Sequence, residues 1–375
     1  MMNFPIIMSI TSGAAFLLGF LLLAHLRKVN FIANTCLGLF IITLGLEMIE
    51  IPLFYNNFNL RHPNLYEMIG LSRFLTAPLL YFSILYFTSV NKKFEYKMLW
   101  HFLPFVFFFI FRIPFFITGK NIEFSPQTAR MFFFVLQMTL PVQALIYWLV
   151  SFVKLHRHLR NLRQISSSTE QNDLVWLKYF LLILLLIIVV WFNLIFFNLG
   201  YLIQFTPFTY LLSVFFLAYF SMQQNEIFDF TKSELNELSS IVSKKESPKR
   251  VAGKRLKELD EKLRILTGSE KVYLENDLSL PKLAQRLDAS CNETSFVINE
   301  LYQDNFYNYI NRYRIEEAKS LLLSNKYYQL NILGIAYESG FNSKTTFNTT
   351  FKKFTGMSPT QFVKANGVLT KDTVN

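Results

Sequence analysis

Long apolar runs separated by short polar loops fill the first 222 residues of the chain. Seven of these runs reach about the 20 residues that an α-helix needs to cross the hydrocarbon core of a membrane. They lie at about residues 4–26, 31–55, 66–90, 98–118, 131–153, 178–199 and 201–222. The pattern predicts that residues 1–222 form a bundle of seven transmembrane helices.

The long apolar runs stop at Met222, and the chain continues with amphipathic helical patterns. Residues 223–272 are predicted to be a cytoplasmic helical linker. Within it, leucines recur at the spacing of an apolar stripe on a helix, at Leu256, Leu259, Leu263 and Leu266. Two interpretations stay open: this helix packs on its own domain, or it acts as a dimer or signalling helix.

Residues 273–365 contain one pattern twice: a short helix, a polar turn and a second helix. The first copy reads KLAQRL, DASCNETS and FVINELY, and the second reads NILGIAYESG, FNS and KTTFNTTFKKF, with Gly356 and Pro359 as stop signals. Between them, NFYNYINRYRIEEAKSLLLS predicts a helix of about 18 residues, roughly 27 Å long. Two such units on a stiff spacer predict insertion into successive major grooves, which recur about every 34 Å on one face of DNA.

The stretch IAYESGFNSKTTFNTTFKKFTGMSP closely resembles the signature that ends the DNA-binding domain of AraC/XylS-type transcription regulators. The resemblance covers residues 273–364, and NFYNYINRYRIEEAKSLL resembles the linker helix of that family, with Arg312, Ala318 and Leu321-Leu322 at matching positions. The order of a multi-span domain, a linker and this module also resembles the membrane-bound AraC-type regulators of Bacteroidetes-like bacteria. The resemblance implies an all-α chain whose C-terminal double helix-turn-helix domain binds double-stranded promoter DNA.

In the second helix-turn-helix unit, the resemblance implies a role for each exposed position. Phe341, Phe347 and Phe351 match core positions. Ser343 stands where the family caps the recognition helix and touches phosphate, a role that the N-cap chemistry of serine also allows. The positions expected to face bases or phosphates are Lys344, Thr345, Asn348, Thr349, Lys352 and Lys353, of which the last two suit phosphate contact.

The first unit departs from the family pattern. Ser290 matches the turn serine, and the DNA-facing positions hold Asn292, Ser295 and Phe296. Thr294, however, replaces a usual core Leu, Phe296 replaces a residue that is often basic, and Gln303 replaces a usual Gly. One interpretation is that Phe296 contacts a thymine methyl group. The other is that this unit binds weakly or mainly positions the second.

The formal net charge of +11 is divided unevenly. Residues 1–222 hold 15 Lys and Arg against 7 Asp and Glu, whereas residues 223–375 hold 22 against 19. Ten cations lie in alternate loops of the apolar part and three in the opposite loops, so the positive-inside rule places the N-terminus outside and the C-terminal domain in the cytoplasm. The ten are Arg27, Lys28, Lys92, Lys93, Lys97, Lys154, Arg157, Arg160, Arg163 and Lys178, and the three are Arg61, Lys120 and Arg130. The small excess on the polar part predicts modest non-specific affinity for DNA, so we expect a homodimer on paired half-sites.

Four ionisable side chains fall at outer depth within the predicted spans: Glu47, Glu50, Arg73 and Arg112. Charged groups are costly in hydrocarbon, so they are expected to face partners or a polar cavity. Two interpretations stay open. The groups form interhelical ion pairs that only hold the bundle together, or they line a pocket, open to the outside, for an unknown small ligand or membrane partner.

None of the spacings HExxH, GxSxG and GxxxxGK[ST], which mark common catalytic and nucleotide-binding sites, occurs in the sequence. Two cysteines, Cys36 and Cys291, are too few for a disulfide framework or a cysteine-based metal site. His156 and His158 are two residues apart and point in different directions on a helix. We predict no enzymatic activity, no metal site and no cofactor.

The patterns together predict a transcription regulator anchored in the cytoplasmic membrane. Residues 1–222 would sense a signal, the linker would transmit it, and residues 273–365 would bind promoter DNA, with a disordered tail over residues 366–375. The alternative is a membrane receptor whose cytoplasmic helical module docks a protein partner and does not bind DNA.

Overall fold

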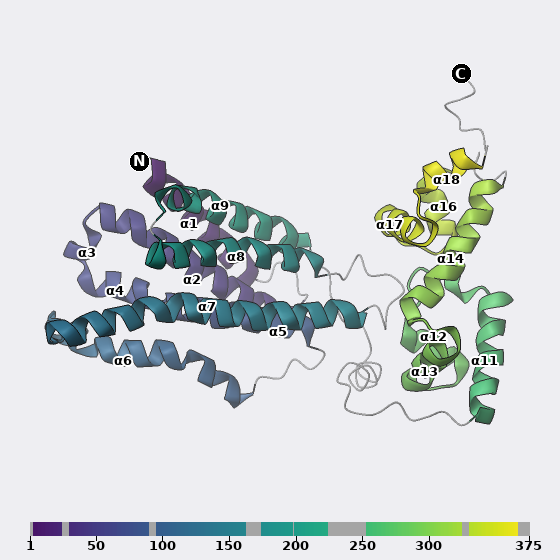
Figure 1. Cartoon of the computed structure of the whole chain (residues 1–375), viewed down its shortest axis with the longest axis horizontal. Coiled ribbons are helices and arrows are strands. Elements are labelled where there is room, and N and C mark those ends of the chain that lie inside the picture. The colour runs from purple at the N-terminus through teal and green to yellow at the C-terminus, as the bar shows by residue number, and fades with distance from the viewer. Residues whose placement is uncertain are drawn as a thin grey trace, which may run out of the picture. The chain divides into compact units, whose positions relative to one another are not determined.

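The computed structural model describes residues 3–24, 30–89, 95–162, 174–197, 199–223, 253–324 and 330–366. These residues form α-helices and short 3₁₀ helices, and no β-strand runs through this part of the chain (Figure 1). The predicted all-α class, with seven long apolar helices and a C-terminal helix-turn-helix domain, is confirmed. Packing divides the chain into an apolar unit and a polar unit.

Some predictions concern residues outside these ranges. They are the loop cations Arg27, Lys28, Lys92, Lys93 and Arg163, the linker between Gln223 and Gly253, and the tail after Asn366.

The helices of the apolar unit follow the predicted apolar runs. They are α1 (Asn3–Leu23), α2 (Phe31–Tyr55), α3 (Phe58–Arg61), α4 (Pro63–Leu71), α5 (Arg73–Thr88), the 3₁₀ helix η1 (Tyr96–Phe102), α6 (Leu103–Thr118), α7 (Pro126–Leu162), α8 (Val175–Phe196) and α9 (Gly200–Gln223). Seven segments of the described chain are long and apolar enough to cross a membrane. The α7 helix has 37 residues and extends beyond its predicted run at both ends.

The third predicted span consists of two helices, α4 and α5, which are separated at Ser72. The Ser72 hydroxyl donates to the carbonyl oxygen of Ile69 at 2.7 Å, which is local side-chain bonding of the kind that competes with a regular helix. Arg73 therefore stands at the first position of α5.

Small residues let α1 and α2 approach closely. A Cβ atom at Gly19 would lie 2.6 Å from Cγ1 of Ile42, and one at Gly38 would lie 3.1 Å from the carbonyl oxygen of Gly19. The Ser12 hydroxyl also donates across the interface to the Gly45 carbonyl at 2.9 Å. Close contact through small residues and interhelical hydrogen bonds is typical of helix pairs in membranes.

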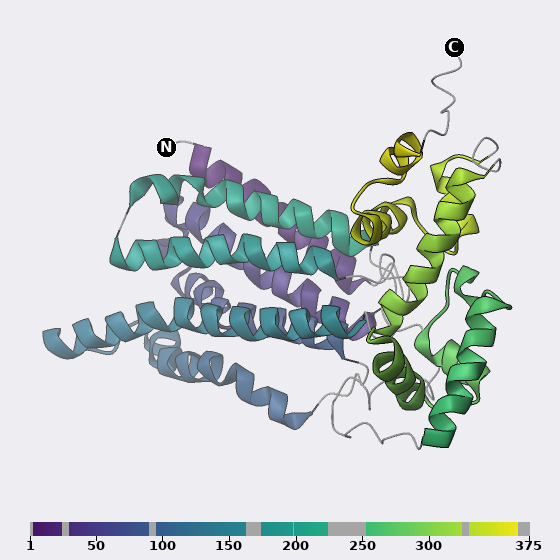
Figure 2. The ribbon, with the colours of Figure 1, turned by 45° about the vertical axis from the view of Figure 1, so that its right-hand side comes forward.

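The α6 and α7 helices lie along one side of the apolar unit in both views (Figure 1, Figure 2). Only 6% and 11% of the residues in their most apolar windows are buried, against 39–56% in the first three segments. Large apolar side chains such as Phe107, Ile110 and Phe134 are exposed there. An apolar outer surface of this kind suits a hydrocarbon environment.

The polar unit is built from shorter helices arranged around one long helix. They are α11 (Gly253–Gly268), the 3₁₀ helix η2 (Val272–Leu274), α12 (Leu280–Leu287), α13 (Cys291–Tyr302), α14 (Phe306–Leu323), α16 (Ile332–Glu338), α17 (Lys344–Thr355) and α18 (Pro359–Ala365). Figure 1 and Figure 2 show α14 running from the group α11–α13 to the group α16–α18. The predicted spacer of about 18 residues matches the 18 residues of α14.

Two hydrophobic cores form at the two ends of α14. Phe306, Tyr309 and Ile310 belong to the core under α12 and α13. Ile315 and Leu322 belong to the core under α16 and α17. The central helix therefore contributes a different apolar stripe to each helix-turn-helix unit.

The α11 helix packs on its own unit, as one of the two interpretations of its leucine spacing held. Leu259, Leu263 and Leu266 are buried in the same core as α12 and α13. The Tyr302 hydroxyl donates to Oδ1 of Asp260 at 2.6 Å. The compact polar unit thus begins upstream of residue 273, the boundary expected from the sequence, because the leucine stripe of α11 is covered by the first unit.

Arg314 on α14 is completely buried, with 0% of its surface exposed. Its Nε donates to the carbonyl oxygen of Tyr273 and a terminal guanidinium nitrogen donates to that of Glu275, each at 2.6 Å. The guanidinium also lies 5.7 Å from the centre of the Phe341 ring. Burial lowers the pKa of Arg314 to about 10, which leaves it charged at neutral pH. One side chain therefore connects the segment around η2, the central helix and the second unit.

Gly340, in the turn after α16, lies against the same segment. Its φ of +85° is in the left-handed region that favours glycine. A Cβ atom there would lie 2.4 Å from the carbonyl oxygen of Tyr273 and 2.8 Å from Cα of Leu274. Only a residue without a side chain allows this approach.

We expect Arg314→Met to lower the free energy of unfolding of residues 253–366 by about 3 kcal/mol or more, because two buried carbonyls lose their donor. Urea unfolding followed by circular dichroism measures the change. Arg312→Met is the matched control, since Arg312 is exposed and pairs with Asp304 at the surface, where such pairs contribute about 0–1 kcal/mol. Equal losses for the two variants would contradict the role of Arg314.

Gly340→Ala should destabilise residues 253–366 by more than the about 1–2 kcal/mol that a left-handed conformation costs an alanine. Its Cβ would also collide with backbone atoms. Gly356→Ala separates the two effects, because Gly356 has a similar φ of +79° and no heavy atom within 4 Å of the added Cβ. Thermal unfolding of both variants measures the difference, and similar midpoints would show that the Gly340 contact is not close.

Candidate functional site

The α17 helix has one buried and one exposed side. Phe347 and Phe351 are fully buried in the second core, and Thr346 and Thr350 lie on the same side. The predicted core role of Phe341, Phe347 and Phe351 matches their packing, in which the three rings meet edge to face. This anchoring leaves the opposite side of α17 facing solvent.

Both ends of α17 are capped. The Ser343 hydroxyl oxygen accepts from the backbone N–H of Thr346 at 3.2 Å. At the other end Gly356 adopts a φ of +79°, and its N–H donates to the carbonyl of Lys352 at 2.9 Å. The free N–H groups and dipole of a capped helix N-terminus favour a phosphate, so Ser343 lies where a backbone contact to DNA is expected.

The exposed side of α17 carries most of the predicted DNA-contacting residues of the second unit. Those that are exposed are Lys344, Thr345, Thr349, Lys352 and Lys353, while Asn348 is half-buried among them. The last of these lysines is held locally, since Lys353 Nζ donates to Oδ1 of Asn308 on α14 at 2.8 Å. A shallow groove of about 540 Å³ runs from Asn348 and Thr349 to the start of α18 at Ser358. Spacing of three and four residues brings this set to one side of the helix.

In the first unit, α13 begins with a reciprocal cap. The Ser290 hydroxyl accepts from the N–H of Glu293, and the Glu293 carboxylate accepts from the N–H of Ser290 at 2.9 Å. The latter bond lowers the pKa of Glu293. Arg255 of α11 reaches the same place: it donates to the Asp288 carbonyl at 2.6 Å and lies 3.7 Å from the Glu293 carboxylate. The α11 helix, which lies within the predicted linker, therefore contacts the turn of the first unit.

The predicted reading positions of α13 are half-buried: Asn292, Ser295 and Phe296. Thr294, which replaces a usual Leu, is fully buried, and its hydroxyl donates to the Ser290 carbonyl at 3.0 Å. Gln303 adopts a φ of +53° at the end of the helix, where glycine would be unstrained. The sequence of α13 has two glutamates and no lysine or arginine, whereas that of α17 has three lysines and no acid.

In the apolar unit, the four predicted charges do not form a single cluster. Arg73 pairs with Glu50. Arg112 pairs instead with Glu67, at 2.9 Å, and also donates to Oδ1 of Asn121 at 3.0 Å. Glu67 was not among the predicted charged residues of the spans, although it lies in the third apolar run. Two of the expected groups thus form one interhelical pair, and Arg112 belongs to another.

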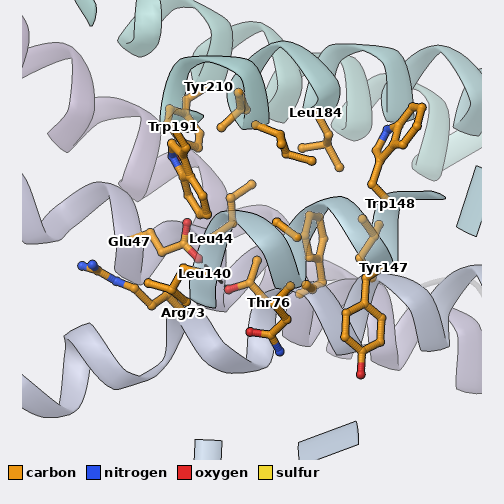
Figure 3. A pocket seen from close by; sticks show the side chains of 17 residues that line it. Leu44, Glu47, Arg73, Thr76, Leu140, Tyr147, Trp148, Leu184, Trp191 and Tyr210 are labelled. Atoms are coloured by element: carbon orange, nitrogen blue, oxygen red, sulfur yellow. Dashed lines mark hydrogen bonds between the residues drawn. The ribbon is translucent and has the colours of Figure 1, made fainter. Parts of the chain in front are cut away.

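Glu47 has a different environment. Its Oε1 accepts from the Thr76 hydroxyl at 2.7 Å. Its Oε2 is buried, and no described group forms a hydrogen bond with it. Figure 3 shows the carboxylate among Thr76, Leu140 and Trp191, with the Arg73 side chain extending away from it.

Glu47 and Arg73 border two adjoining cavities. The smaller one has a volume of about 60 Å³ and a mostly apolar wall. The larger one, of about 1400 Å³, is bordered by Glu50, Gln137 and Gln204 as well. A third cavity of about 490 Å³ is bordered by Glu50, Arg73, Glu67 and Arg112. The predicted charges of the spans therefore all lie at cavity walls.

Comparison with known proteins relates part of the polar unit to a known domain family. Residues 283–365 match the family described as a helix-turn-helix domain. The chain is 32% identical over 103 residues to uncharacterized HTH-type transcriptional regulators of Staphylococcus aureus strains COL and N315, a match that covers 28% of this chain and 13% of each relative. The C-terminal domain of AraT, a response regulator from Geobacillus stearothermophilus, is 26% identical, with 33% of this chain and 93% of that one covered and a TM-score of 0.26.

The match spans about an eighth of the length of these regulators and lies at the C-terminal end of the present chain. It coincides with the two helix-turn-helix units built on α14. The C-terminal part of this chain is therefore an AraC-type helix-turn-helix domain, homologous to that of HTH-type transcriptional regulators.

Proposed function

We propose that the chain is a membrane-anchored, sequence-specific DNA-binding transcription regulator that couples a signal at the membrane to promoter binding. The observation that carries this proposal is the exposed side of α17. It is capped at Ser343, anchored by Phe347 and Phe351, and lined by lysines and threonines. Those side chains have the donors and methyl groups that read base edges in a major groove.

In this proposal, the N-terminal half of α17 enters the groove. Lys344 and Thr345 open the helix, and Asn348 and Thr349 follow one turn later on the same side. Ser343 and Lys352 bind phosphates on either side of the groove and set the register of the helix. Lys353 supports the same strand while remaining bound to Asn308.

The first unit has a secondary part in the proposal. Without a cation on α13, it adds little attraction to phosphate. Phe296, half-buried on that helix, is available for a thymine methyl contact. Specific binding then depends on the second unit and on a second copy of the chain at a paired half-site.

The apolar unit is proposed to lie in the cytoplasmic membrane. Seven helices long and apolar enough to cross it support this placement, and so does the excess of cations in alternate loops. The odd number of spans places the N-terminus outside and the DNA-binding unit in the cytoplasm. Arg255 of α11, in contact with the turn of the first unit, is where a change in the upstream chain would reach the DNA-binding unit.

Lys344→Ala should weaken specific DNA binding by residues 253–366 about 5- to 150-fold, the equivalent of about 1–3 kcal/mol for a base contact. Fluorescence anisotropy with native upstream DNA, against scrambled DNA of equal length and at a fixed salt concentration, measures the effect. Lys257→Ala removes an equal charge from an exposed position of α11 and should change the affinity by less than about threefold. Equal binding to native and scrambled DNA, unaffected by Lys344→Ala, would instead favour a module that docks a protein partner.

Single cysteines should report the orientation. In a chain with Cys36→Ala and Cys291→Ala, we expect a membrane-impermeant maleimide to label Arg61→Cys in intact cells and to spare Lys97→Cys until the cells are lysed. Both positions are exposed. Arg61 lies in the loop before the predicted third span, and Lys97 lies in the loop after it. Labelling of Lys97→Cys in intact cells would invert the proposed topology.

A further inference from the structure

We propose that Glu47 is the anchoring residue of a binding site for an amphiphilic amine, a molecule with a cationic N–H head and an apolar body. This inference rests on the proposed function, since it names the class of ligand that the membrane unit would sense. The site consists of the two adjoining cavities that Glu47 borders (Figure 3).

The charge of the ligand follows from the groups around the cavities. Three carboxyl groups and two guanidinium groups border the cavities of about 60, 1400 and 490 Å³. Both guanidinium groups are already in ion pairs, Arg73 with Glu50 and Arg112 with Glu67. Among the described residues Glu47 forms no ion pair of its own, and the guanidinium of Arg73, which lies near it, is paired with Glu50. An ionised carboxylate away from water requires a compensating positive charge.

The need for an N–H donor follows from the hydrogen bonds of Glu47. Thr76 satisfies Oε1 at 2.7 Å, whereas Oε2 is buried without a donor among the described residues. A buried acceptor that lacks a donor costs free energy, more so when it is charged. An ammonium or amidinium group supplies both the charge and the donor, and a quaternary ammonium supplies only the charge.

The apolar body follows from the walls. The small cavity is bordered by Leu44, Leu140 and Leu184, and Trp191 and Tyr210 border both cavities. Aromatic faces next to a carboxylate also favour a cation. The larger cavity, about 1400 Å³, exceeds the ~300–1,000 Å³ of ordinary small-molecule sites, so it accommodates the rest of such a ligand.

The position of the larger cavity gives a route of entry. Its wall includes Phe4 near the start of α1, Tyr55 at the end of α2 and Gly200 at the start of α9. In the proposed topology, these three helix ends lie on the outer side of the membrane. An amine would enter from outside and place its head at Glu47.

The test uses the full chain in nanodiscs of zwitterionic lipid and three probes of one shape: 4-phenylbutylamine, 4-phenylbutan-1-ol and 4-phenylbutyrate. Tryptophan fluorescence reports binding, since Trp148 and Trp191 border the small cavity. We expect an apparent Kd for the amine at least about tenfold lower than for the alcohol and the acid. Equal affinities for the amine and the alcohol, or a signal that follows pH and does not respond to the amine, would overturn the proposal.

Glu47→Gln keeps the shape and the acceptor for Thr76 but removes the charge, so it should abolish the preference for the amine. Glu123→Gln is the matched control, because Glu123 is exposed in the loop before α7 and borders none of the three cavities. A preference that survives Glu47→Gln would contradict the assignment.

If the Glu47→Gln variant does not fold, ligand binding by the wild-type chain still tests whether the site requires an N–H donor. It should bind 4-phenylbutylamine at least about threefold more tightly than its trimethylammonium analogue, which has no N–H donor. Equal binding would overturn the proposal. The fragment of residues 253–366 contains none of the residues that border the three cavities. Its DNA binding therefore tests the regulator proposal even if the amine site is disproved.

Discussion

The buried guanidinium of Arg314 is the interaction on which the arrangement of the two helix-turn-helix units depends. A charge removed from water is tolerated only where hydrogen bonds satisfy it, and here two backbone carbonyls near η2 do so. The same side chain lies against the turn at Gly340 and the ring of Phe341. The distance between α13 and α17 is therefore set by a polar contact at the middle of α14 as well as by the length of that helix.

In the proposed function the two units have unequal roles, because the sequences of α13 and α17 have opposite charge. The α17 sequence has three lysines, and the α13 sequence has two glutamates. The unit with less attraction to DNA is also the one that α11 contacts, through Arg255 at the Asp288 carbonyl and the Glu293 carboxylate. A change in the position of α11 would thus act first on the cap of α13, and it would reach the second unit through Arg314 and through the contact between the η2 segment and Gly340. In the proposed function, this order would allow a signal to adjust the register of the first unit while the proposed DNA contacts of α17 stay in place.

The buried stripes of the helices and the N-cap of α17 were predictable from the sequence. The partners of the buried and paired arginine side chains were not. The leucines of α11, the phenylalanines of α17 and the cap at Ser343 follow from local spacing, which the structure repeats. The spacing did not show which of Arg312 and Arg314 is buried, because both are polar residues two apart on one helix. Nor did it pair Arg112 with Glu67, since that pair joins α6 and α4, and no apolar run reveals how these two helices lie against each other.

In the apolar unit, the carboxyl group of Glu47 remains outside the two ion pairs between helices. An arginine and a glutamate that meet across two helices are neutral together and can serve packing alone. The two pairs of this unit are of that kind, which agrees with the interpretation that they hold helices together. Glu47 is not, because Thr76 gives it a hydrogen bond without a charge. In the proposed amine site, this third carboxylate is the group that would pair with the cationic head of the ligand.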